Sequence, residues 1–279
     1  MKIAISTEST CDLTNELIKE NNLFVVPFNV ILGEQEFKDD NQLTQKMLYD
    51  FVAKTNVLPK TAAISDFEFE NHFKNIFDNG YDAIIHLSIS SNLSSSFANA
   101  KRVSEKMKNV FVVDTKSLST GIGLLVLSAI DKVKQNRNPE EIVSEIVSQI
   151  PLVQASFVIN NLRYLYKGGR CSSLALLGAN ILKIKPQIVL TNGKMIVGKK
   201  YRGKHNEVLE IYSKDILRDN KPDLERVFIT SSSKVEFERD MVKIVKDFGF
   251  KNVYITSAGA TICSHCGPDT IGILFINKE

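Results

Sequence analysis

The 279-residue sequence has few cysteines, and it lacks any long run of apolar residues. Its four cysteines, at positions 11, 171, 263 and 266, are too few in a chain of this length for a disulfide scaffold. No stretch approaches the ~18 consecutive apolar residues of a membrane-spanning helix. The opening MKIAISTEST turns polar too early for the apolar core of a signal peptide. We therefore expect a cytoplasmic protein.

The sequence also has little net charge. It contains 35 Lys and Arg against 32 Asp and Glu, a formal charge of +3 that is too weak and too dispersed to indicate a nucleic-acid partner. Hydrophobic residues make up 43%, which excludes a disordered chain and is typical of a folded globular protein.

Several signatures of cofactor chemistry are missing. The chain has no G-x-x-x-x-G-K-[ST] phosphate loop and no G-x-S-x-G nucleophile elbow. Gly-Ile-Gly at 121–123 opens like a dinucleotide fingerprint, but Val126 stands in place of the third glycine and the run is helix-like. Cys-Ser-His-Cys at 263–266 has no second cysteine pair for a structural zinc, and Gly-Pro follows it. We expect no cofactor and no metal.

The first half alternates β-rich and amphipathic segments, which predicts a parallel α/β sheet with helices on both faces. Strand-like runs occupy residues 2–6, 23–32, 82–88 and 109–114. Pro27, inside the second run, indicates an edge or a bulge.

The second half predicts a mixed α+β domain. Residues 185–200 form a strong hairpin pattern around Asn192 and Gly193, which suit a type I′ turn. Helices at 206–218 and 234–248 then alternate with strands at 226–231, 252–257 and 271–277. We expect two domains, 1–155 and 156–279.

Hydroxyl side chains gather after two predicted strands, at 6–10 and at 90–96, and Thr61 lies in a loop before a predicted helix. Loops that leave the carboxyl ends of strands in an α/β sheet meet at one edge, where ligands bind. Residues 94–96 begin a helix, so their N–H groups and hydroxyls could hold an anion. The alternative for each serine is a simple N-cap. The clustering favours an anion site.

Arg170, Arg202 and His265 lie in loops with neighbouring glycines, which permit close backbone approach. Each alone would ordinarily be a surface charge or a satisfied histidine.

Taken together, the chain resembles the DegV family, bacterial fatty-acid-binding proteins that serve as the lipid-carrying subunit of a fatty-acid kinase. The resemblance spans essentially the whole chain. It rests on six segments in order: 6–13, 59–61, 87–96, 113–117, 162–170 and 264–268. Each segment alone is weak evidence, but the ordered set is specific.

The resemblance implies a fatty acid in an apolar tunnel between two α/β domains. By position, Thr61 and Ser94 would hydrogen-bond the carboxylate with help from the N–H of Ser95, and His265 and Arg202 match a polar network beside it. The apolar run 174–182 would be either tunnel wall or plain core.

The resemblance also implies a non-catalytic protein. Arg170 matches a surface arginine that meets the kinase rather than the lipid, and the kinase would supply the nucleotide. The expected partners are a long-chain fatty acid, the kinase and, transiently, a membrane surface.

The sequence departs from the family pattern at four places. Glu8 stands where the family has Asp, and Ala62 and Ala63 replace more polar residues. Serines at 95–96 replace a Gly-Thr pair, and Cys266 replaces a threonine. These changes alter side chains at or beside the expected site, and they leave fatty-acid binding as the expected function.

The alternative function is a hydrolase or acyltransferase that acts on lipid esters, with Ser94 as nucleophile and His265 as base. It would require a third group that orients His265, and an oxyanion hole.

Overall fold

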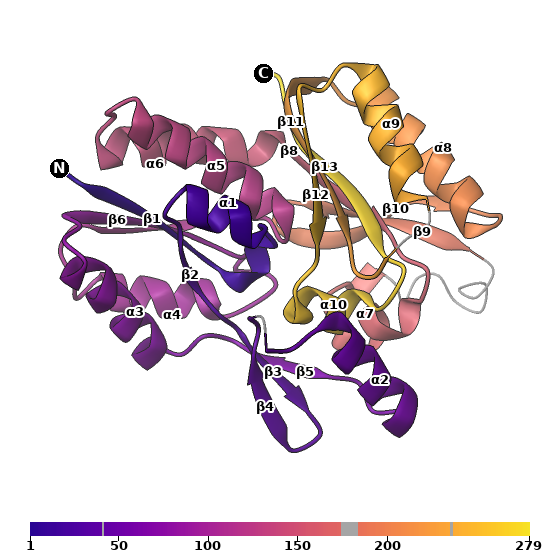
Figure 1. Cartoon of the computed structure of the whole chain (residues 1–279), viewed down its shortest axis with the longest axis horizontal. Helices are drawn as coiled ribbons and strands as arrows, with labels where there is room; N and C mark the ends of the chain where they lie inside the picture. Colours follow the sequence, from indigo (N-terminus) through magenta and orange to yellow (C-terminus); the bar gives the residue numbers. More distant parts are fainter. Residues whose placement is uncertain (41, 174–183, 235–236) are drawn as a thin grey trace.

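The computed structural model describes residues 1–40, 42–173, 184–234 and 237–279 (Figure 1). Two large sheets lie side by side, each covered by helices, and a small third sheet projects below the first one. The predicted fold, a parallel α/β part followed by a mixed α+β part, is confirmed.

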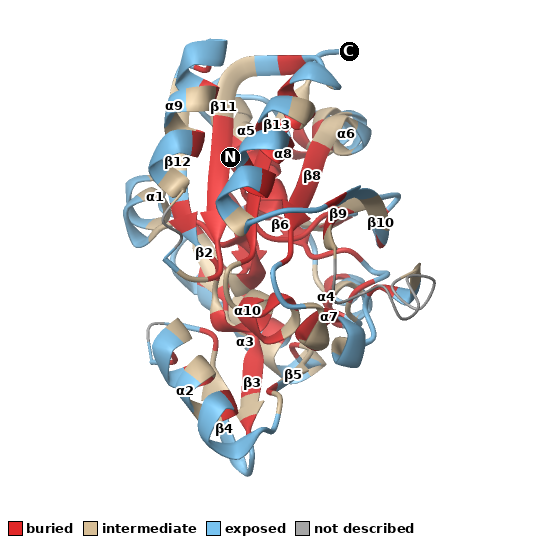
Figure 2. Ribbon diagram, turned by 90° about the vertical axis from the view of Figure 1, so that its right-hand side faces the viewer, coloured by how far each residue is buried: buried red, intermediate tan, exposed pale blue. Residues whose placement is uncertain are grey.

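The N-terminal sheet has the order β2-β1-β6-β7, and all of its strands are parallel. The strands are β1 (Ile3–Glu8), β2 (Phe24–Val26), β6 (Ala83–Ser88) and β7 (Val110–Asp114). Its helices are α1 (Asn15–Glu20), α3 (Asp66–Asp78), α4 (Ser96–Ser104), α5 (Thr120–Lys134) and α6 (Pro139–Gln149). Every residue of β6 is buried (Figure 2), because helices cover both faces of the sheet.

The run at 23–32 divides into two strands of different sheets. β2 ends at Val26, and β3 (Asn29–Leu32) joins a small antiparallel sheet of order β4-β3-β5. Pro27 lies between them and has no N–H to donate to a ladder, so the change of sheet falls there. The small sheet carries β4 (Gln35–Lys38), β5 (Lys60–Ala62) and the neighbouring helix α2 (Gln45–Thr55).

The C-terminal sheet has the order β10-β9-β8-β13-β11-β12 and is mixed, with only β11 and β12 paired in parallel among the described pairs. Its strands are β8 (Val153–Val158), β9 (Lys185–Thr191), β10 (Lys194–Tyr201), β11 (Pro222–Ser231), β12 (Asn252–Ser257) and β13 (Ile271–Asn277). Its helices are α7 (Leu162–Gly168), α8 (His205–Arg218), α9 (Glu238–Phe248) and α10 (Ala260–Cys266).

The hairpin of β9 and β10 turns at Asn192 and Gly193, both with positive φ (50° and 77°), as a type I′ turn requires. β8 lies across the predicted boundary between residues 155 and 156, and that boundary stays a prediction.

Helix α5 packs between the two large sheets and contacts β1 as well as β8 and β13. A Cβ on Gly121 would lie 3.4 Å from Ala155 Cβ, and one on Gly123 would lie 3.2 Å from the carbonyl oxygen of Cys11. The Gly-Ile-Gly sequence therefore lies within a helix, as expected, and permits close packing there. No helix in the described part of the chain is long and apolar enough to cross a membrane.

Candidate functional site: a pocket between the two sheets

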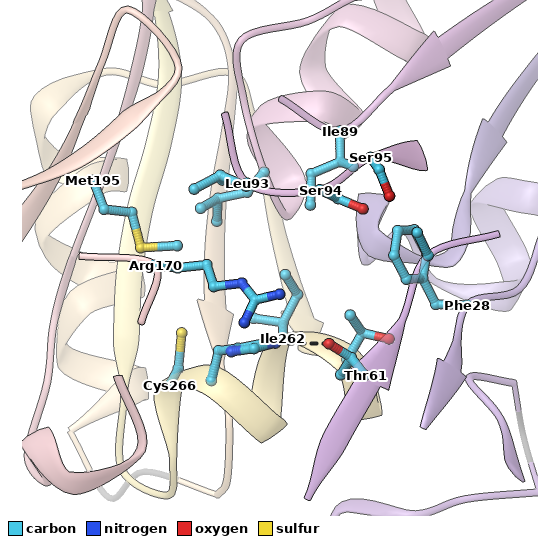
Figure 3. Close-up of a pocket in the computed structure, with 14 residues that line it drawn as sticks. Phe28, Thr61, Ile89, Leu93, Ser94, Ser95, Arg170, Met195, Ile262 and Cys266 are labelled. Carbon is cyan, nitrogen blue, oxygen red and sulfur yellow. Dashed lines mark hydrogen bonds between the residues drawn. The ribbon is translucent and has the colours of Figure 1, made fainter. Parts of the chain in front are cut away.

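A pocket of about 260 Å³ opens where the loops of the two large sheets face each other (Figure 3). It is lined by Phe28, Thr61, Ala63, Ile89, Leu93, Ser94, Ser95, Leu118, Arg170, Met195, Thr261, Ile262, His265 and Cys266. A smaller cavity of about 30 Å³ shares Leu118, Ile262 and Cys266 with it and reaches inward to Phe157 and Leu274. The pocket thus has a polar mouth and an apolar interior.

The start of α4 brings two predicted serines to this pocket. Ser94 Oγ accepts a hydrogen bond from the N–H of Ser96 at 3.1 Å, which leaves the Ser94 hydroxyl proton free to donate. Ser95 occupies the N-cap position, yet its side chain makes no capping hydrogen bond. No described group accepts a hydrogen bond from its backbone N–H. The side chain at the N-cap position therefore does not cap the helix, and the hydrogen bond at the helix start goes to Ser94 instead. The remaining donors lie at the positive end of the helix.

Thr61 and His265 meet across the pocket, from β5 and α10. The Thr61 hydroxyl lies 2.9 Å from His265 Nε2 (Figure 3). Burial, assisted by the charge of Arg170, lowers the pKa of His265 to about 4, so the imidazole is neutral at neutral pH. Its Nδ1 is buried without a hydrogen-bond partner among the described residues. A Cβ on Gly168 would lie 2.7 Å from that nitrogen, so α7 packs directly against the ring.

Two aspartates from the N-terminal half hold the start of α10. Asp39 accepts hydrogen bonds from the N–H groups of Ala260 at 2.6 Å and Thr261 at 3.2 Å. Asp12 accepts one from the N–H of Gly259 at 2.8 Å. Burial raises the pKa of Asp12 to about 8. Sequence reasoning missed this role of both residues. Asp12 lies within segment 6–13, which carries part of the family resemblance, but no spacing along the chain signals a contact with residue 259.

The two arginines differ in their relation to the pocket. Arg170 is exposed and also lines the mouth, where its Nη1 donates to the Gly168 carbonyl at 2.7 Å. Figure 3 shows its guanidinium pointing toward Thr61. Arg202 follows β10, is exposed and is not part of the pocket lining. The structure thus brings Thr61, Ser94, Ser95 and His265 to one pocket, which Arg170 also lines. Arg202 lies apart from them.

The hydrolase alternative gains no support from this geometry. The hydrogen-bond partner of His265 in the described part of the chain is Thr61, not Ser94. An orienting carboxylate at Nδ1 is missing from the same residues. A catalytic triad would require both contacts.

The Cys-Ser-His-Cys sequence lies on α10. Cys263 and Cys266 are buried free thiols, and the Cys263 thiol lies 3.3 Å from the Ala258 carbonyl oxygen. Across the described ranges, no three His, Cys, Asp or Glu side chains group as metal ligands would.

Comparisons with known proteins agree with this fold. The model of a family described as uncharacterised proteins of the DegV family matches residues 2–278. A DegV domain-containing protein of Clostridium acetobutylicum is 30% identical, over 99% of each chain. The structure of Bacillus subtilis DegV, described as a fatty acid binding protein, is 26% identical over 100% of both chains, with a TM-score of 0.83. A structure described as fatty acid binding of a DegV family protein from Thermus thermophilus is 24% identical over 100% of both chains. Its TM-score of 0.90 shows a shared fold.

Proposed function

Because the chain belongs to the DegV family, we propose that it binds a long-chain fatty acid without catalysing a reaction and presents the carboxylate to a kinase. The observation that carries this proposal is the pocket itself, in which hydrogen-bond donors surround the mouth and apolar side chains line the interior. Relatives of the same fold are described as fatty acid binding proteins.

The donors at the mouth suit a carboxylate. Leaving a buried carboxylate unpaired costs several kcal/mol, so a fatty-acid site must supply donors. The Thr61 and Ser94 hydroxyls and the Ser95 N–H supply them. In the tautomer with its proton on Nε2, neutral His265 donates to Thr61, and the Thr61 hydroxyl is then directed to the ligand. Arg202, the fifth predicted contact, lies outside the pocket lining and forms no part of this proposal.

The interior suits an acyl chain. Phe28, Leu93, Leu118, Met195 and Ile262 provide apolar walls. Each buried CH₂ contributes roughly 0.8 kcal/mol, so a long chain binds tightly without any reaction. The run 174–182, expected as tunnel wall or core, lies outside the described residues.

The mouth is open enough for a partner. The groups that would bond the carboxylate, Thr61, Ser94 and the Ser95 N–H, are neutral, and the charged Arg170 guanidinium lies beside them at the rim. Such donors leave a carboxylate oxygen able to attack a phosphoryl group. Since the sequence has no phosphate-binding loop, the nucleotide belongs to the kinase. Exposed Arg170, at the rim, is the proposed contact with that partner. Contact with a membrane surface and a cytoplasmic location stay predictions.

Three alanine variants test this division of roles. Thr61→Ala and Ser94→Ala should each lower the affinity for a long-chain fatty acid, measured by displacement of a fluorescent analogue. Arg170→Ala should keep that affinity and lower the rate at which a fatty-acid kinase phosphorylates the bound acid. Ser91→Ala is a matched control, since Ser91 is an exposed serine of the same loop. Equal loss of binding in all three variants would contradict the proposal.

The hydrolase alternative has its own test. Purified protein is incubated with a p-nitrophenyl ester of a fatty acid and then weighed by mass spectrometry. Neither turnover nor an acyl adduct is expected. Turnover that disappears in Ser94→Ala would establish the alternative.

A further inference from the structure

The carboxylate of Glu8 lies directly behind the serine loop of the pocket. Glu8 ends β1 and is fully buried. Its Oε2 accepts a hydrogen bond from the Ile89 N–H at 2.7 Å. Its Oε1 accepts from the hydroxyls of Ser88 at 2.7 Å and Ser96 at 2.6 Å. These three donors come from the segment 88–96, which joins β6 to α4.

The anchoring points bracket the pocket donors. Ser88 and Ile89 begin the segment and Ser96 ends it, while Ser94 and Ser95 lie between the anchors and line the pocket. Ser96 also donates its N–H to Ser94 Oγ. The Glu8 carboxylate therefore fixes the residue whose backbone holds the Ser94 hydroxyl.

A histidine–serine chain packs behind Glu8. His86 Nε2 lies 3.7 Å from Glu8 Oε1, and His86 Nδ1 is 2.9 Å from the Ser6 hydroxyl. Ser6 Oγ in turn is 2.7 Å from Nε2 of half-buried His72. The carboxylate is thus enclosed on both sides, although no Lys or Arg pairs with it in the described part of the chain. A buried carboxylate adds little net stability compared with apolar packing, so its value here lies in the geometry that it imposes.

We propose that Glu8 is a positioning residue for the carboxylate site: it holds segment 88–96 so that the Ser94 hydroxyl and the Ser95 N–H face the ligand. This inference rests on the proposed function, because it takes the ligand to be a fatty acid whose carboxylate meets these donors. Glu8 itself is absent from the pocket lining.

The test compares two ligands with the same tail. Affinities for hexadecanoic acid and for 1-hexadecanol are measured for wild type, Glu8→Gln, Ser96→Ala and Ser96→Thr. Gln keeps the size of Glu8, but its amide cannot accept from all three donors. Ser104→Ala is the matched control, since Ser104 is a buried serine of the same helix that bonds to the Lys101 carbonyl instead.

Glu8→Gln and Ser96→Ala should each weaken binding of the acid by about tenfold, the range of one hydrogen bond to a charged group, and change binding of the alcohol less than about twofold. Ser96→Thr keeps the hydroxyl and should restore acid binding. The double variant Glu8→Gln/Ser96→Ala should lose no more than either single variant, because the two groups act through one contact.

The outcomes separate the two proposals. If wild type binds acid and alcohol equally, the carboxylate site is wrong and the role of Glu8 fails with it. If wild type prefers the acid and both variants keep that preference, only the inference about Glu8 is overturned. Equal loss for both ligands would also overturn it, since that is the result of a merely structural role. Should Glu8→Gln fail to fold, the Ser96 variants decide by the same criterion.

Discussion

The hydroxyl of Thr61 lies 2.9 Å from Nε2 of His265, although 204 positions separate the two residues in the sequence. One belongs to β5 of the small sheet and the other to α10 of the C-terminal half. Their contact joins the small sheet to α10 at the edge of the pocket, so the proposed carboxylate site depends on how the two halves of the chain pack.

Removing His265 should reduce the loss of stability in acid. The pKa of His265 is about 4 in the folded protein, against an ordinary value of 6.5. Because the folded pKa is lowered, the unfolded chain binds more protons between pH 6.5 and 4. The free energy of unfolding therefore falls as the pH drops through this window, by up to about 3 kcal/mol from this group. Urea unfolding at several pH values should show a shallower decrease for His265→Gln.

His72 provides the comparison for that experiment. Burial lowers its pKa to about 3, so His72→Gln should flatten the same acid limb. The effects of the two variants should add, because the residues lie in different clusters. Identical pH profiles for wild type and His265→Gln would show that His265 is not buried in its neutral form.

Asp12 should give the opposite pH dependence to His265: its contribution to the free energy of unfolding falls as the pH rises. Burial raises the pKa of Asp12 to about 8, so the folded state holds this proton where the unfolded chain has lost it. Its stabilising contribution is complete below pH 3.8 and is lost as the pH rises through 8. The steepest part corresponds to about 1.4 kcal/mol per pH unit.

Asp12→Asn tests this behaviour directly. Its amide oxygen can still accept from the Gly259 N–H, and its NH₂ can donate to Ser119, whose hydroxyl donates to Asp12 in the wild type. Relative to wild type, the variant should gain stability between pH 4 and 8 and no more above that range. A difference that stays constant with pH would contradict the raised pKa.

Narrowing the junction between the two cavities should alter the preferred chain length. Leu118 lines both the outer pocket and the inner cavity. Leu118→Phe should therefore weaken binding of octadecanoic acid about tenfold or more relative to dodecanoic acid, since several CH₂ groups lose their place. Met195→Leu, a volume-conserving change in the outer pocket alone, is the control. An equal effect on both acids would mean that the tail does not pass Leu118.

Adding a methyl group to α5 at Gly123 should destabilise the packing of this helix against the segment that follows β1. A Cβ on Gly123 would lie 2.7 Å from Leu13 Cδ2 as well as close to the Cys11 backbone. Ala is the better helix former by about 1 kcal/mol, but overpacking costs ~1–3 kcal/mol. Gly123→Ala should thus lower the free energy of unfolding in urea. A gain in stability would show that α5 is packed less closely.

The sequence predicted the features that depend on local patterns. The turn at Asn192 and Gly193 could be read because these residues adopt positive φ readily, and their neighbours alternate in β-rich runs. The four-stranded parallel sheet followed from the alternation of strands and helices. At Pro27 the pattern showed an interruption, but it could not show that the two flanking strands enter different sheets.

Contacts between distant segments were beyond the reach of these patterns. The hydrogen bonds of Asp12 and Asp39 to the start of α10 join residues more than 200 positions apart. Glu8 was seen only as a departure from the family's Asp, whereas the fold gives it three donors of the serine loop. Arg202 is the opposite case. The family resemblance placed it beside the carboxylate, but in this fold it lies outside the pocket lining.

Native mass spectrometry of the freshly purified protein tests the central claim most directly. Purification is followed by denaturation, lipid extraction and identification of the released molecules. The account predicts a mass excess equal to one long-chain fatty acid, recovered as the free acid, and a smaller fraction of loaded protein in Thr61→Ala. A protein that carries no lipid, and that still shows the mass of the bare chain after incubation with fatty acids of different lengths, would contradict it.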